Sequence, residues 1–417
     1  MKILNFGSCN IDYVYSLDHI VLPGETLSAS AMEVFPGGKG LNQSVAAARA
    51  GAMVYHAGVI GKDGGMLRKV LQDSGADVSF LETADCPNGH AIIQLSSTAQ
   101  NSIFLYEGTN GMVSESMVDR VLECFGPGDI LLLQNEISNV PYLIRRGREK
   151  GMTVVFNPAP FDKSLLKLDL NCIDYLILNE VEASGFFGTE DVGTIAQEAA
   201  RWPGLKLVVT LGKKGCVFIS GDTVLPCPAF QVQAVDTTAA GDTFTGFFVS
   251  MICAGSDSGK AVRYACAASA LAVSAKGAAP SIPTMEQVEH ALTYLKTYPA
   301  QEESKQARLH KNILQYLEKE LQHVDLAGLA KHLGYSESYT GTLVRELTGE
   351  TFGVLLQRLR CQQAAKALRE TELPVGTVIH NVGYQNESFF RAAFKAHYGK
   401  TPLQYRKQWT GGNKDDQ

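Results

Sequence analysis

The sequence lacks the apolar runs and the leader segment that would place it in or across a membrane. No hydrophobic stretch approaches the length needed to span a bilayer, and residues 1–7 form a strand-like start without the extended apolar segment of a signal peptide. The nine cysteines are scattered, odd in number and without a CxxC pair, which disfavours both a disulfide framework and a zinc site. We therefore expect a cytoplasmic protein with reduced thiols and no membrane partner.

The chain as a whole also lacks a large excess of charge, since its net charge is −6. Its N-terminal and C-terminal parts, however, differ in the sign of their net charge. Residues 1–304 hold 21 Lys and Arg against 32 Asp and Glu, a balance of −11, whereas residues 305–417 hold 16 against 11, a balance of +5. The basic C-terminal part indicates contact with nucleic acid, although many basic helical domains bind none.

The first 296 residues alternate apolar, strand-like runs with stretches of helical periodicity. The strand-like runs include residues 91–95, 129–133, 153–156 and 205–210, and residues 140–150 have helical spacing. Continuous apolar strands separated by helices are typical of a largely parallel sheet that is covered on both faces. We therefore expect an α/β domain over residues 1–296.

The rest of the chain has the pattern of an all-helical domain. A polar stretch, residues 297–307, follows the last α/β element and is expected to be a linker. Residues 308–417 then contain an internal repeat, because the segment 329–335 resembles the segment 378–384 and each is followed by a second amphipathic stretch. Two helix-turn-helix units are the simplest account of the repeat, and 417 residues leave room for both domains.

Asp242 follows the small residues Ala239-Ala240-Gly241, between a strand-like run and an apolar helix predicted over residues 244–252. Small residues leave the first backbone N–H groups of a helix open, and such a terminus stabilises an anionic phosphate. A carboxylate in the same turn is able to accept a proton from a substrate hydroxyl. The alternative is a tight strand-to-helix turn in which Asp242 is only a capping acid.

A second glycine-rich segment, Gly37-Gly38-Lys39-Gly40, precedes an Ala-rich helix predicted over residues 44–50. Its glycines permit close backbone approach to a ligand, and Lys39 and Asn42 supply donors for hydroxyl oxygens. The spacing does not fit a Walker A motif. Asp12 follows the first strand-like run, where α/β proteins gather ligands, although such an aspartate taken alone is more often a turn residue.

Together, these segments resemble the ribokinase family, the PfkB-type carbohydrate kinases. The resemblance covers residues 1–293 and is strongest around Lys39 and around Asp242. Further similar pieces follow in the family's order: Pro23-Gly24-Glu25, Gln134-Asn135-Glu136, Asn157-Pro158-Ala159-Pro160, Asn179-Glu180-Val181-Glu182 and Thr210-Leu211-Gly212-Lys213-Lys214-Gly215. The runs 157–160 and 277–283 are more similar to ribokinases than to fructokinases or adenosine kinases. The resemblance implies a ribokinase-like α/β fold, a mostly parallel sheet flanked by helices, with a small β lid.

The resemblance also implies roles for individual residues. The positions that would hold the sugar hydroxyls are Asp12, Gly38, Lys39, Asn42, Glu136 and Asp242. Asp242 would remove the proton from the primary hydroxyl, while the amides of Ala239, Ala240 and Gly241 would stabilise charge on the transferring γ-phosphoryl group. The implied reaction is the ATP-dependent phosphorylation of a sugar, first of all D-ribose to D-ribose 5-phosphate.

ATP, Mg²⁺ and K⁺ are the cofactors that the resemblance implies. The positions similar to the family's ATP contacts are Asn179, Thr210, Gly212, Gly215 and Gly241, and Glu182 would help to organise Mg²⁺. The positions similar to its potassium site are Asp236, Thr238, Ala272, Ala275, Gly277 and Ser281; without the resemblance, residues 277–280 would be interpreted as a loop. Cys266 departs from the pattern, because ribokinases commonly place His or Asn there near the adenine, and cysteine is a weak donor.

In the helical part, Asp325 and Ser336 are predicted to cap the two helices of the first unit. We expect Tyr339, Leu343 and Leu347 to face inward in that unit, and Phe389, Phe390 and Phe394 in the second, with a long helix over residues 352–368 between the units. The outward positions have side chains of the types that contact phosphates and base edges in a major groove. They are Ser338, Thr340, Thr342 and Arg345, then Ser388, Arg391 and Lys395.

The helical part resembles the AraC-type DNA-binding domain, most specifically at Tyr398-Gly399-Lys400-Thr401-Pro402-Leu403-Gln404-Tyr405-Arg406. The resemblance implies that two helix-turn-helix units bind double-stranded DNA in successive major-groove segments. A helical interaction module with solvated charges is the alternative.

Two functions remain open for the whole chain. The first is a bifunctional protein, a sugar kinase fused to a transcription-regulator domain. In the second, the kinase fold is mainly a sugar sensor for the DNA-binding part, and a kinase for another sugar or a nucleoside is a further possibility. Ribokinase-like proteins often dimerise through their lid, which residues 12–34 are expected to form, so the resemblance implies a homodimer.

Overall fold

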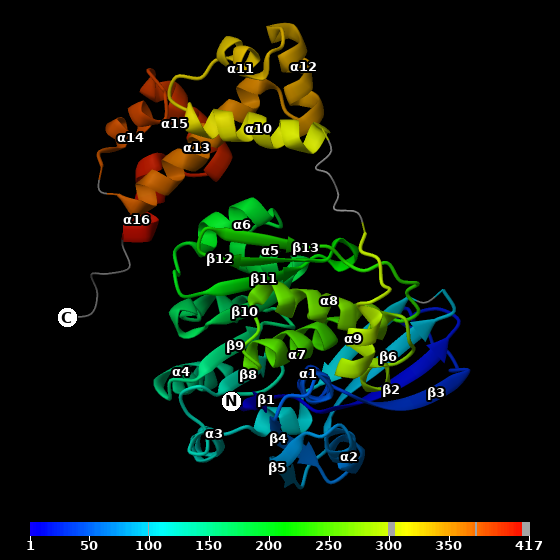
Figure 1. Cartoon of the computed structure of the whole chain (residues 1–417). Helices are drawn as coiled ribbons and strands as arrows, with labels where there is room; N and C mark the ends of the chain where they lie inside the picture. The colour runs from blue at the N-terminus through cyan, green and yellow to red at the C-terminus, as the bar shows by residue number, and fades with distance from the viewer. Residues whose placement is uncertain (99, 299–304, 372, 411–417) are drawn as a thin grey trace, which may run out of the picture. The chain divides into compact units, whose positions relative to one another are not determined.

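The computed structural model describes the 417-residue chain except residues 99, 299–304, 372 and 411–417, and it contains two compact units, residues 1–300 and 301–417 (Figure 1). Most of the expected linker, residues 299–304, lies outside the described part. Helix α10 (Lys305–Lys319) begins within the segment expected to be that linker. In the described part of the chain, no helix is long and apolar enough to cross a membrane.

A large sheet runs through the first unit in the order β13-β12-β11-β10-β9-β8-β1-β4-β5. All neighbouring strands are parallel except at one edge, where β11, β12 and β13 pair antiparallel. The strands are β1 (Ile3–Phe6), β4 (Val54–Gly61), β5 (Asp77–Ala84), β8 (Ile130–Gln134), β9 (Thr153–Asn157), β10 (Tyr175–Asn179), β11 (Lys206–Thr210), β12 (Cys216–Ser220) and β13 (Thr223–Cys227). Strand β8 is buried along its whole length and apolar from Ile130 to Leu133, because helices cover both faces of the sheet. The predicted α/β fold is therefore confirmed.

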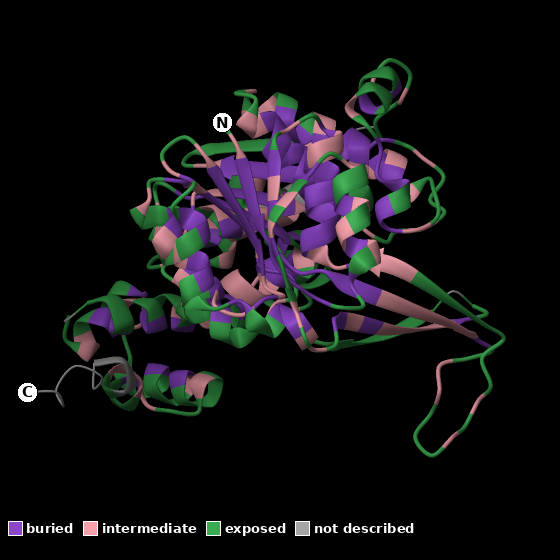
Figure 2. Cartoon of the chain, turned by 90° about the horizontal axis from the view of Figure 1, so that it is seen from below, coloured by how far each residue is buried: buried purple, intermediate pink, exposed green. Residues whose placement is uncertain are grey.

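Two layers of helices cover the sheet, and each layer forms a hydrophobic core with it. One face is covered by α1 (Lys39–Arg49), α2 (Gly65–Asp73), α7 (Ala240–Cys253), α8 (Ser258–Val273) and α9 (Met285–Ala291). The other is covered by α3 (Glu115–Leu122), α4 (Val140–Glu149), α5 (Glu180–Phe187) and α6 (Val192–Ala199). Figure 2 shows the buried residues along the strands and on the inward faces of these helices.

A smaller sheet, β3-β2-β6-β7, projects from this unit and forms the expected lid. Its strands are β2 (Asn10–Leu17), β3 (Ala31–Gly37), β6 (Gly89–Ser96) and β7 (Asn101–Tyr106). Residues 91–95 were expected among the strands of the large sheet, and that prediction is wrong, because β6 pairs in parallel with β2 instead. A short apolar run indicates a strand but not which sheet it joins. Strand β7 is exposed along its whole length.

The second unit contains only helices, and they form two cores around one long helix, α13 (Phe352–Glu370). The first half of α13 packs with α10, α11 (Leu326–Leu333) and α12 (Glu337–Thr348). The second half packs with α14 (Val375–Asn381), α15 (Glu387–Tyr398) and α16 (Pro402–Thr410). These are the two helix-turn-helix units that the repeat predicted, and Asp325 and Ser336 cap α11 and α12 as expected.

Three predictions of side-chain direction in this unit are wrong. Thr340 is fully buried, whereas Tyr339 is 52% exposed and Phe389 is 62% exposed. Helix α12 buries residues 340, 343 and 344, and α15 buries residues 390 and 394. Leu343, Phe390 and Phe394 are buried as predicted, so the errors concern only Tyr339, Thr340 and Phe389.

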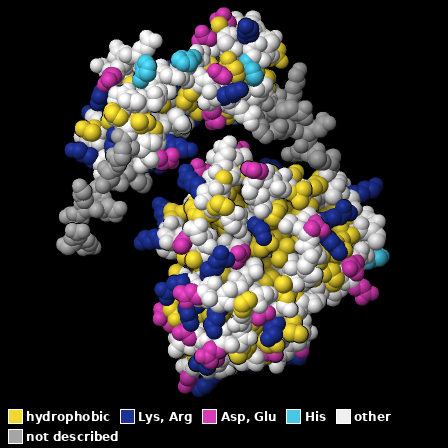
Figure 3. Space-filling view, turned by 60° about the vertical axis from the view of Figure 1, so that its left-hand side comes forward, with side chains coloured by type: hydrophobic (Ala, Val, Ile, Leu, Met, Phe, Trp, Pro, Cys, Tyr) yellow, Lys and Arg dark blue, Asp and Glu magenta, His cyan; other side chains and the backbone are white. Residues whose placement is uncertain are grey.

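The surface of the first unit carries charges of both signs. On the face seen in Figure 3, Lys and Arg side chains lie among Asp and Glu side chains. The acidic balance of this unit is therefore not gathered into one continuous patch on that face.

Candidate active site

Helix α7 begins directly after Ala239, whose φ of 58° places a non-glycine residue in the left-handed region. No side chain caps the helix, and the N–H groups of Ala239, Gly241 and Asp242 have no acceptor among the described residues. The N–H of Ala240 donates to the carbonyl of Thr237 over 3.3 Å. A Cβ added at Gly241 would meet no atom within 4 Å. This turn is therefore an open helix N-terminus that suits an anion.

The carboxylate of Asp242 lies in the first turn of α7 and is only 8% exposed. Its two oxygens accept hydrogen bonds from helix α1: Asn42 Nδ2 donates to Oδ2 and Gln43 Nε2 to Oδ1, both over 3.0 Å. Helix α1 begins at Lys39 rather than at residue 44, so the predicted start of this helix is wrong, although Gly37 and Gly38 do precede it. Gly38 takes the turn into the helix with φ 94°, where a Cβ would lie 2.9 Å from the N of Asn10.

A buried network of amides extends from Asp242 into the sheet. Gln43 Nε2 also donates to Asn157 Oδ1 over 3.0 Å, and Gln134 Nε2 donates to Gln43 Oε1 over 2.7 Å and to Asn5 Oδ1 over 3.0 Å. None of these amides was predicted to have a role. A signal was present, since Gln134 and Asn157 end the apolar strands β8 and β9, and polar residues at the carboxyl ends of parallel strands gather at one edge of the sheet.

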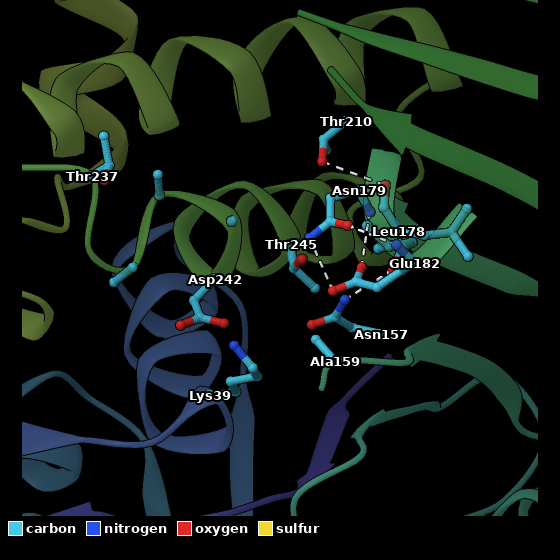
Figure 4. A pocket seen from close by; sticks show the side chains of 14 residues that line it. Lys39, Asn157, Ala159, Leu178, Asn179, Glu182, Thr210, Thr237, Asp242 and Thr245 are labelled. Atoms are coloured by element: carbon cyan, nitrogen blue, oxygen red, sulfur yellow. Dashed lines mark hydrogen bonds between the residues drawn. The ribbon is translucent and has the colours of Figure 1, made fainter. Parts of the chain in front are cut away.

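Lys39 lies among four carboxylates. Burial would lower the pKa of its ammonium group, but Asp242, Glu136, Glu182 and Asp12 raise it above its usual value. Figure 4 shows the Lys39 and Asp242 side chains pointing toward each other. The structure therefore gathers at one place the acidic and basic residues that the resemblance assigned to the sugar.

Burial raises the pKa of three of these carboxyl groups, those of Glu136, Glu182 and Asp12. Burial raises the pKa of Glu136, against the influence of Lys39, and Glu136 Oε2 accepts from Ser8 Oγ over 2.6 Å and from the Lys39 backbone N–H over 3.0 Å. Burial, then the charges of Glu136 and Asp242, raise the pKa of Asp12 to about 7. Clustered carboxyl groups with raised pKa values are typical of ligand sites.

A cleft of about 250 Å³ opens beside Asp242 (Figure 4). Its lining includes Lys39, Asn157, Asn179, Glu182, Thr210, Thr237 and Thr245, together with Ala239, Ala240 and Gly241. Asn179 and Glu182 form a capping box at the start of α5: Asn179 Oδ1 accepts from the Glu182 backbone N–H over 2.9 Å, and Glu182 Oε2 accepts from the Asn179 backbone N–H over 2.8 Å. Asn179, Thr210 and Gly241, three of the residues expected to contact the nucleotide, thus line the same cleft as Asp242.

The helical unit exposes most of the residues predicted to contact DNA. Helix α12 exposes Ser338, Thr342 and Arg345, and α15 exposes Ser388, Arg391 and Lys395. Arg391 forms an ion pair with Glu387 over 2.9 Å. Thr340 is the exception, because its buried side chain lies on the core side of α12. Tyr339 and Phe389 occupy the third position of their helices and add an exposed aromatic ring to each surface.

Comparison with known proteins agrees with this geometry. Residues 1–285 match the pfkB family of carbohydrate kinases. The chain belongs to this family. It is 38% identical over 301 residues to the ribokinase of Haemophilus influenzae, covering 68% of this chain and 97% of that protein. It is 32% identical over 307 residues to the deoxyribokinase of Salmonella typhi, covering 70% of this chain and 99% of that protein.

A solved structure agrees with the family assignment. Arabidopsis thaliana ribokinase, complexed with ribose and ATP, superposes with a TM-score of 0.62 at 31% identity and covers 70% of this chain and 99% of that protein. Residues 329–408 match a helix-turn-helix domain. The chain is thus an ATP-dependent carbohydrate kinase that also carries an AraC-type helix-turn-helix domain.

The remaining predicted positions of this kinase lie around α8 and its C-terminal end. Burial alone would raise the pKa of Asp236, but hydrogen bonds from Thr238 and the Gly277 N–H lower it. Asp236 Oδ1 accepts from Thr238 Oγ1 over 2.6 Å and Oδ2 from Gly277 N over 3.0 Å, so this carboxylate joins the two loops of the predicted potassium site. Ala272 lies in the last turn of α8, Ala275 lies just after the helix, and Ser281 is buried.

Gly212 and Gly215 form the turn after β11, whereas Cys266 is buried in the middle of α8. The Cys266 thiol lies 3.6 Å from that of Cys216, and the residue is not part of the cleft lining.

Proposed function

We propose that the chain transfers the γ-phosphoryl group of ATP to the primary hydroxyl of D-ribose, giving D-ribose 5-phosphate and ADP. The observation that carries this proposal is the placement of Asp242. Its buried carboxylate is oriented by Asn42 and Gln43 and lies in the open first turn of α7, beside Lys39. The ribokinases of Haemophilus influenzae and Arabidopsis thaliana, the latter complexed with ribose and ATP, support ribose as the acceptor.

The sugar would be held by Asp12, Gly38, Lys39, Asn42 and Glu136. Carboxylates of Asp12 and Glu136 accept hydrogen bonds from hydroxyl groups, whereas Lys39 and the Asn42 amide donate them. Asn42 Oδ1 is buried and has no partner among the described residues. A buried acceptor without a partner is costly, and a sugar hydroxyl would satisfy it.

In the transfer step, Asp242 accepts the proton of the primary hydroxyl while that oxygen attacks the γ-phosphorus. The bond from the γ-phosphorus to the bridging oxygen breaks, and ADP leaves. The N–H groups of Ala239 and Gly241, with Ala240 beside them, stabilise the charge on the phosphoryl oxygens. Asn179 and Thr210 line the cleft where ATP would lie, next to the turn that holds Gly212 and Gly215.

The described residues fit the two metal ions that the family implies. Both oxygens of Glu182 accept hydrogen bonds from Asn179, so Glu182 would hold Mg²⁺ indirectly, through water. Bound Mg²⁺ neutralises phosphate charge. The potassium positions Asp236, Thr238, Ala272, Ala275, Gly277 and Ser281 offer a carboxylate, hydroxyls and backbone carbonyls, an all-oxygen donor set that suits an alkali cation.

A coupled assay for ADP release, with a panel of sugars and nucleosides, tests the substrate. We expect D-ribose to give the highest kcat/KM, with 2-deoxy-D-ribose next, full dependence on Mg²⁺, and higher turnover in K⁺ than in Na⁺. A hexose or nucleoside whose kcat/KM is ten times that of D-ribose would overturn the substrate assignment. No turnover with any member of the panel would overturn the kinase mechanism.

We further infer that the helical unit binds double-stranded DNA through α12 and α15. The exposed Ser338, Thr342 and Arg345 on one helix and Ser388, Arg391 and Lys395 on the other support this inference, and Tyr339 and Phe389 add contact area. Selection from a random DNA pool would supply a site. We expect Arg345→Ala and Lys395→Ala to weaken binding at least tenfold and Lys62→Ala, in the kinase unit, to leave it unchanged. Equal loss in all three variants would contradict the inference.

Dimerisation through the lid is the third inference. Apolar side chains on β3 and β7 are about half exposed, among them Met32, Ile103 and Phe104. We expect light scattering of the full chain to give a dimer mass and the Phe104→Glu variant to give a monomer. A monomeric wild-type chain would contradict a homodimer.

A further inference from the structure

Three cysteines that are far apart in the sequence come together at the edge of the large sheet. Cys216 is the first residue of β12, Cys227 is the last residue of β13, and Cys266 lies in the middle of α8. Cys216 and Cys227 are directly paired across the two strands. The three sulfur atoms all lie within 4.8 Å of one another, and no other such group of His, Cys, Asp or Glu occurs among the described residues.

The spacing of these sulfurs suits a metal ion better than a covalent bridge. A tetrahedral ion with metal–sulfur bonds of about 2.3 Å holds its sulfurs about 3.8 Å apart, whereas a disulfide requires about 2.05 Å. The Cys216 and Cys266 sulfurs are 3.6 Å apart. Clustered thiolates select soft ions such as Zn²⁺ and Cu⁺.

Charge favours a divalent ion over a monovalent one. Three thiolates and a divalent ion leave one net negative charge, and the guanidinium of Arg263, one turn before Cys266 on α8, is the cation that acts on Cys227. A monovalent ion would leave a second negative charge uncompensated in a partly buried site, which is costly. Cys227 is only partly buried, so solvent reaches the cluster from its side.

We propose that Cys216, Cys227 and Cys266 bind a soft divalent metal ion of the Zn²⁺ class through three thiolates, with the fourth coordination position open to water. Metal binding would release the thiol protons to solvent and would change no oxidation state. The bound ion would tie the β12–β13 hairpin to α8 and so stabilise the edge of the sheet.

The location of the cluster connects it with the nucleotide side of the cleft. Cys216 directly follows Gly215, and Ser269, one turn beyond Cys266 on α8, donates its hydroxyl to the Ala240 carbonyl over 3.0 Å. Metal occupancy is therefore expected to change the KM for ATP by at least twofold and the KM for the sugar by less. This consequence rests on the proposed kinase function, whereas metal binding itself does not.

The test uses the full chain, reduced with a phosphine, freed of metal with a chelator and titrated with Co²⁺ and Cd²⁺. We expect one equivalent to bind, with thiolate-to-metal charge-transfer absorption and, for Co²⁺, the visible bands of a tetrahedral ion. Cys227→Ser should weaken binding at least tenfold. Cys124→Ser, which alters an exposed thiol elsewhere, should not. Absence of the absorption, or its survival in Cys227→Ser, would overturn the proposal.

A second readout avoids any effect of substitution on folding. In the wild-type chain, Cd²⁺ should protect Cys227, the partly exposed thiol of the three, from alkylation, measured by mass spectrometry of peptides, while Cys124 is alkylated at an unchanged rate. If Cd²⁺ does not slow the alkylation of Cys227, the site is contradicted. Metal binding with no kinase turnover would leave the site standing and refute only the proposed function.

Discussion

Gln43 Nε2 donates a hydrogen bond to Asp242 Oδ1 over 3.0 Å, although the two residues are 199 positions apart in the sequence. The contact is possible because α1 and α7 pack closely at Gly246, where an added Cβ would lie 2.4 Å from the Cβ of Ala46. With Asn42 on the other oxygen, α1 fixes the direction of the carboxylate that the kinase would use as its base. A group that is oriented before the substrate arrives needs no reorganisation during the reaction.

Gln43→Leu should therefore lower kcat by about tenfold or more, because a hydrogen bond to a charged group contributes about 1.5–3 kcal/mol. The KM for the sugar should change less than twofold, since Gln43 orients Asp242 and is not among the residues proposed to contact the sugar. Steady-state kinetics on folded protein, checked by its Tm, measures both constants. Gln72→Leu, on the exposed side of α2, is the control and should change neither. A rise in KM with kcat unaltered would contradict the orienting role.

Gly241→Ala separates the anion site from the fold. A Cβ at position 241 meets open space, and alanine is the better helix former, so stability should rise by about 0.5–1 kcal/mol. Turnover should nevertheless fall by about 100-fold or more, because the methyl group would enter the space proposed for the phosphoryl group. Gly65→Ala, at the start of α2 and also in open space, should be stabilised without loss of turnover. Equal activity in the two variants would place the phosphate elsewhere.

The raised pKa of Asp12, about 7, predicts how pH changes stability. Between its ordinary value of 3.8 and about 7, the folded chain binds this proton more tightly than the unfolded chain, so stability is lost as the pH rises through that window. Asp12→Asn removes the effect. Between pH 5 and pH 8, the free energy of unfolding of the variant should therefore rise relative to that of wild type by on the order of 2 kcal/mol.

Thermal unfolding of both proteins across this pH range measures the difference. Asp222→Asn, in the exposed turn between β12 and β13, is the matched control and should follow wild type at every pH. A difference between Asp12→Asn and wild type that does not vary with pH would show that Asp12 is ionised at its ordinary pKa.

The sequence predicted the fold because its strands are buried on both faces. A continuous apolar run such as Ile130-Leu131-Leu132-Leu133 is typical of a strand at the centre of a sheet that helices cover on both faces. It could not place residues 91–95 in the lid, since partner choice between sheets depends on contacts that are far apart in the sequence. Likewise Tyr339 was placed inward in α12 and Thr340 outward, because an aromatic ring is more apolar than a threonine side chain.

In the site, motif residues such as Lys39 and Asp242 were found, whereas the amide network was not. Gln43, Gln134 and Asn157 belong to three separate segments, and only the fold brings them to one carboxylate. The cysteine cluster was missed for the same reason. Spacing along the chain excluded a CxxC pair, but β12, β13 and α8 meet in space.

Thr340→Val tests the corrected surface of α12. The hydroxyl of Thr340 is buried and has no partner among the described residues, so replacing it with a methyl group should leave stability unchanged or raise it by about 1 kcal/mol. DNA affinity should be unaltered. The exposed Thr342→Val variant is the comparison and should bind DNA more weakly. A tenfold loss of DNA affinity in Thr340→Val at unchanged Tm would show that Thr340 does contact DNA.

Phosphorus NMR of the full chain with ATP, Mg²⁺, K⁺ and D-ribose, run beside Asp242→Asn, follows the product itself. We expect wild type to form D-ribose 5-phosphate and ADP in equal amounts, and Asp242→Asn to form them about 10²–10⁴-fold more slowly at unchanged Tm. Release of phosphate without a sugar phosphate, or turnover by Asp242→Asn within tenfold of wild type, would contradict a ribose kinase with Asp242 as its base.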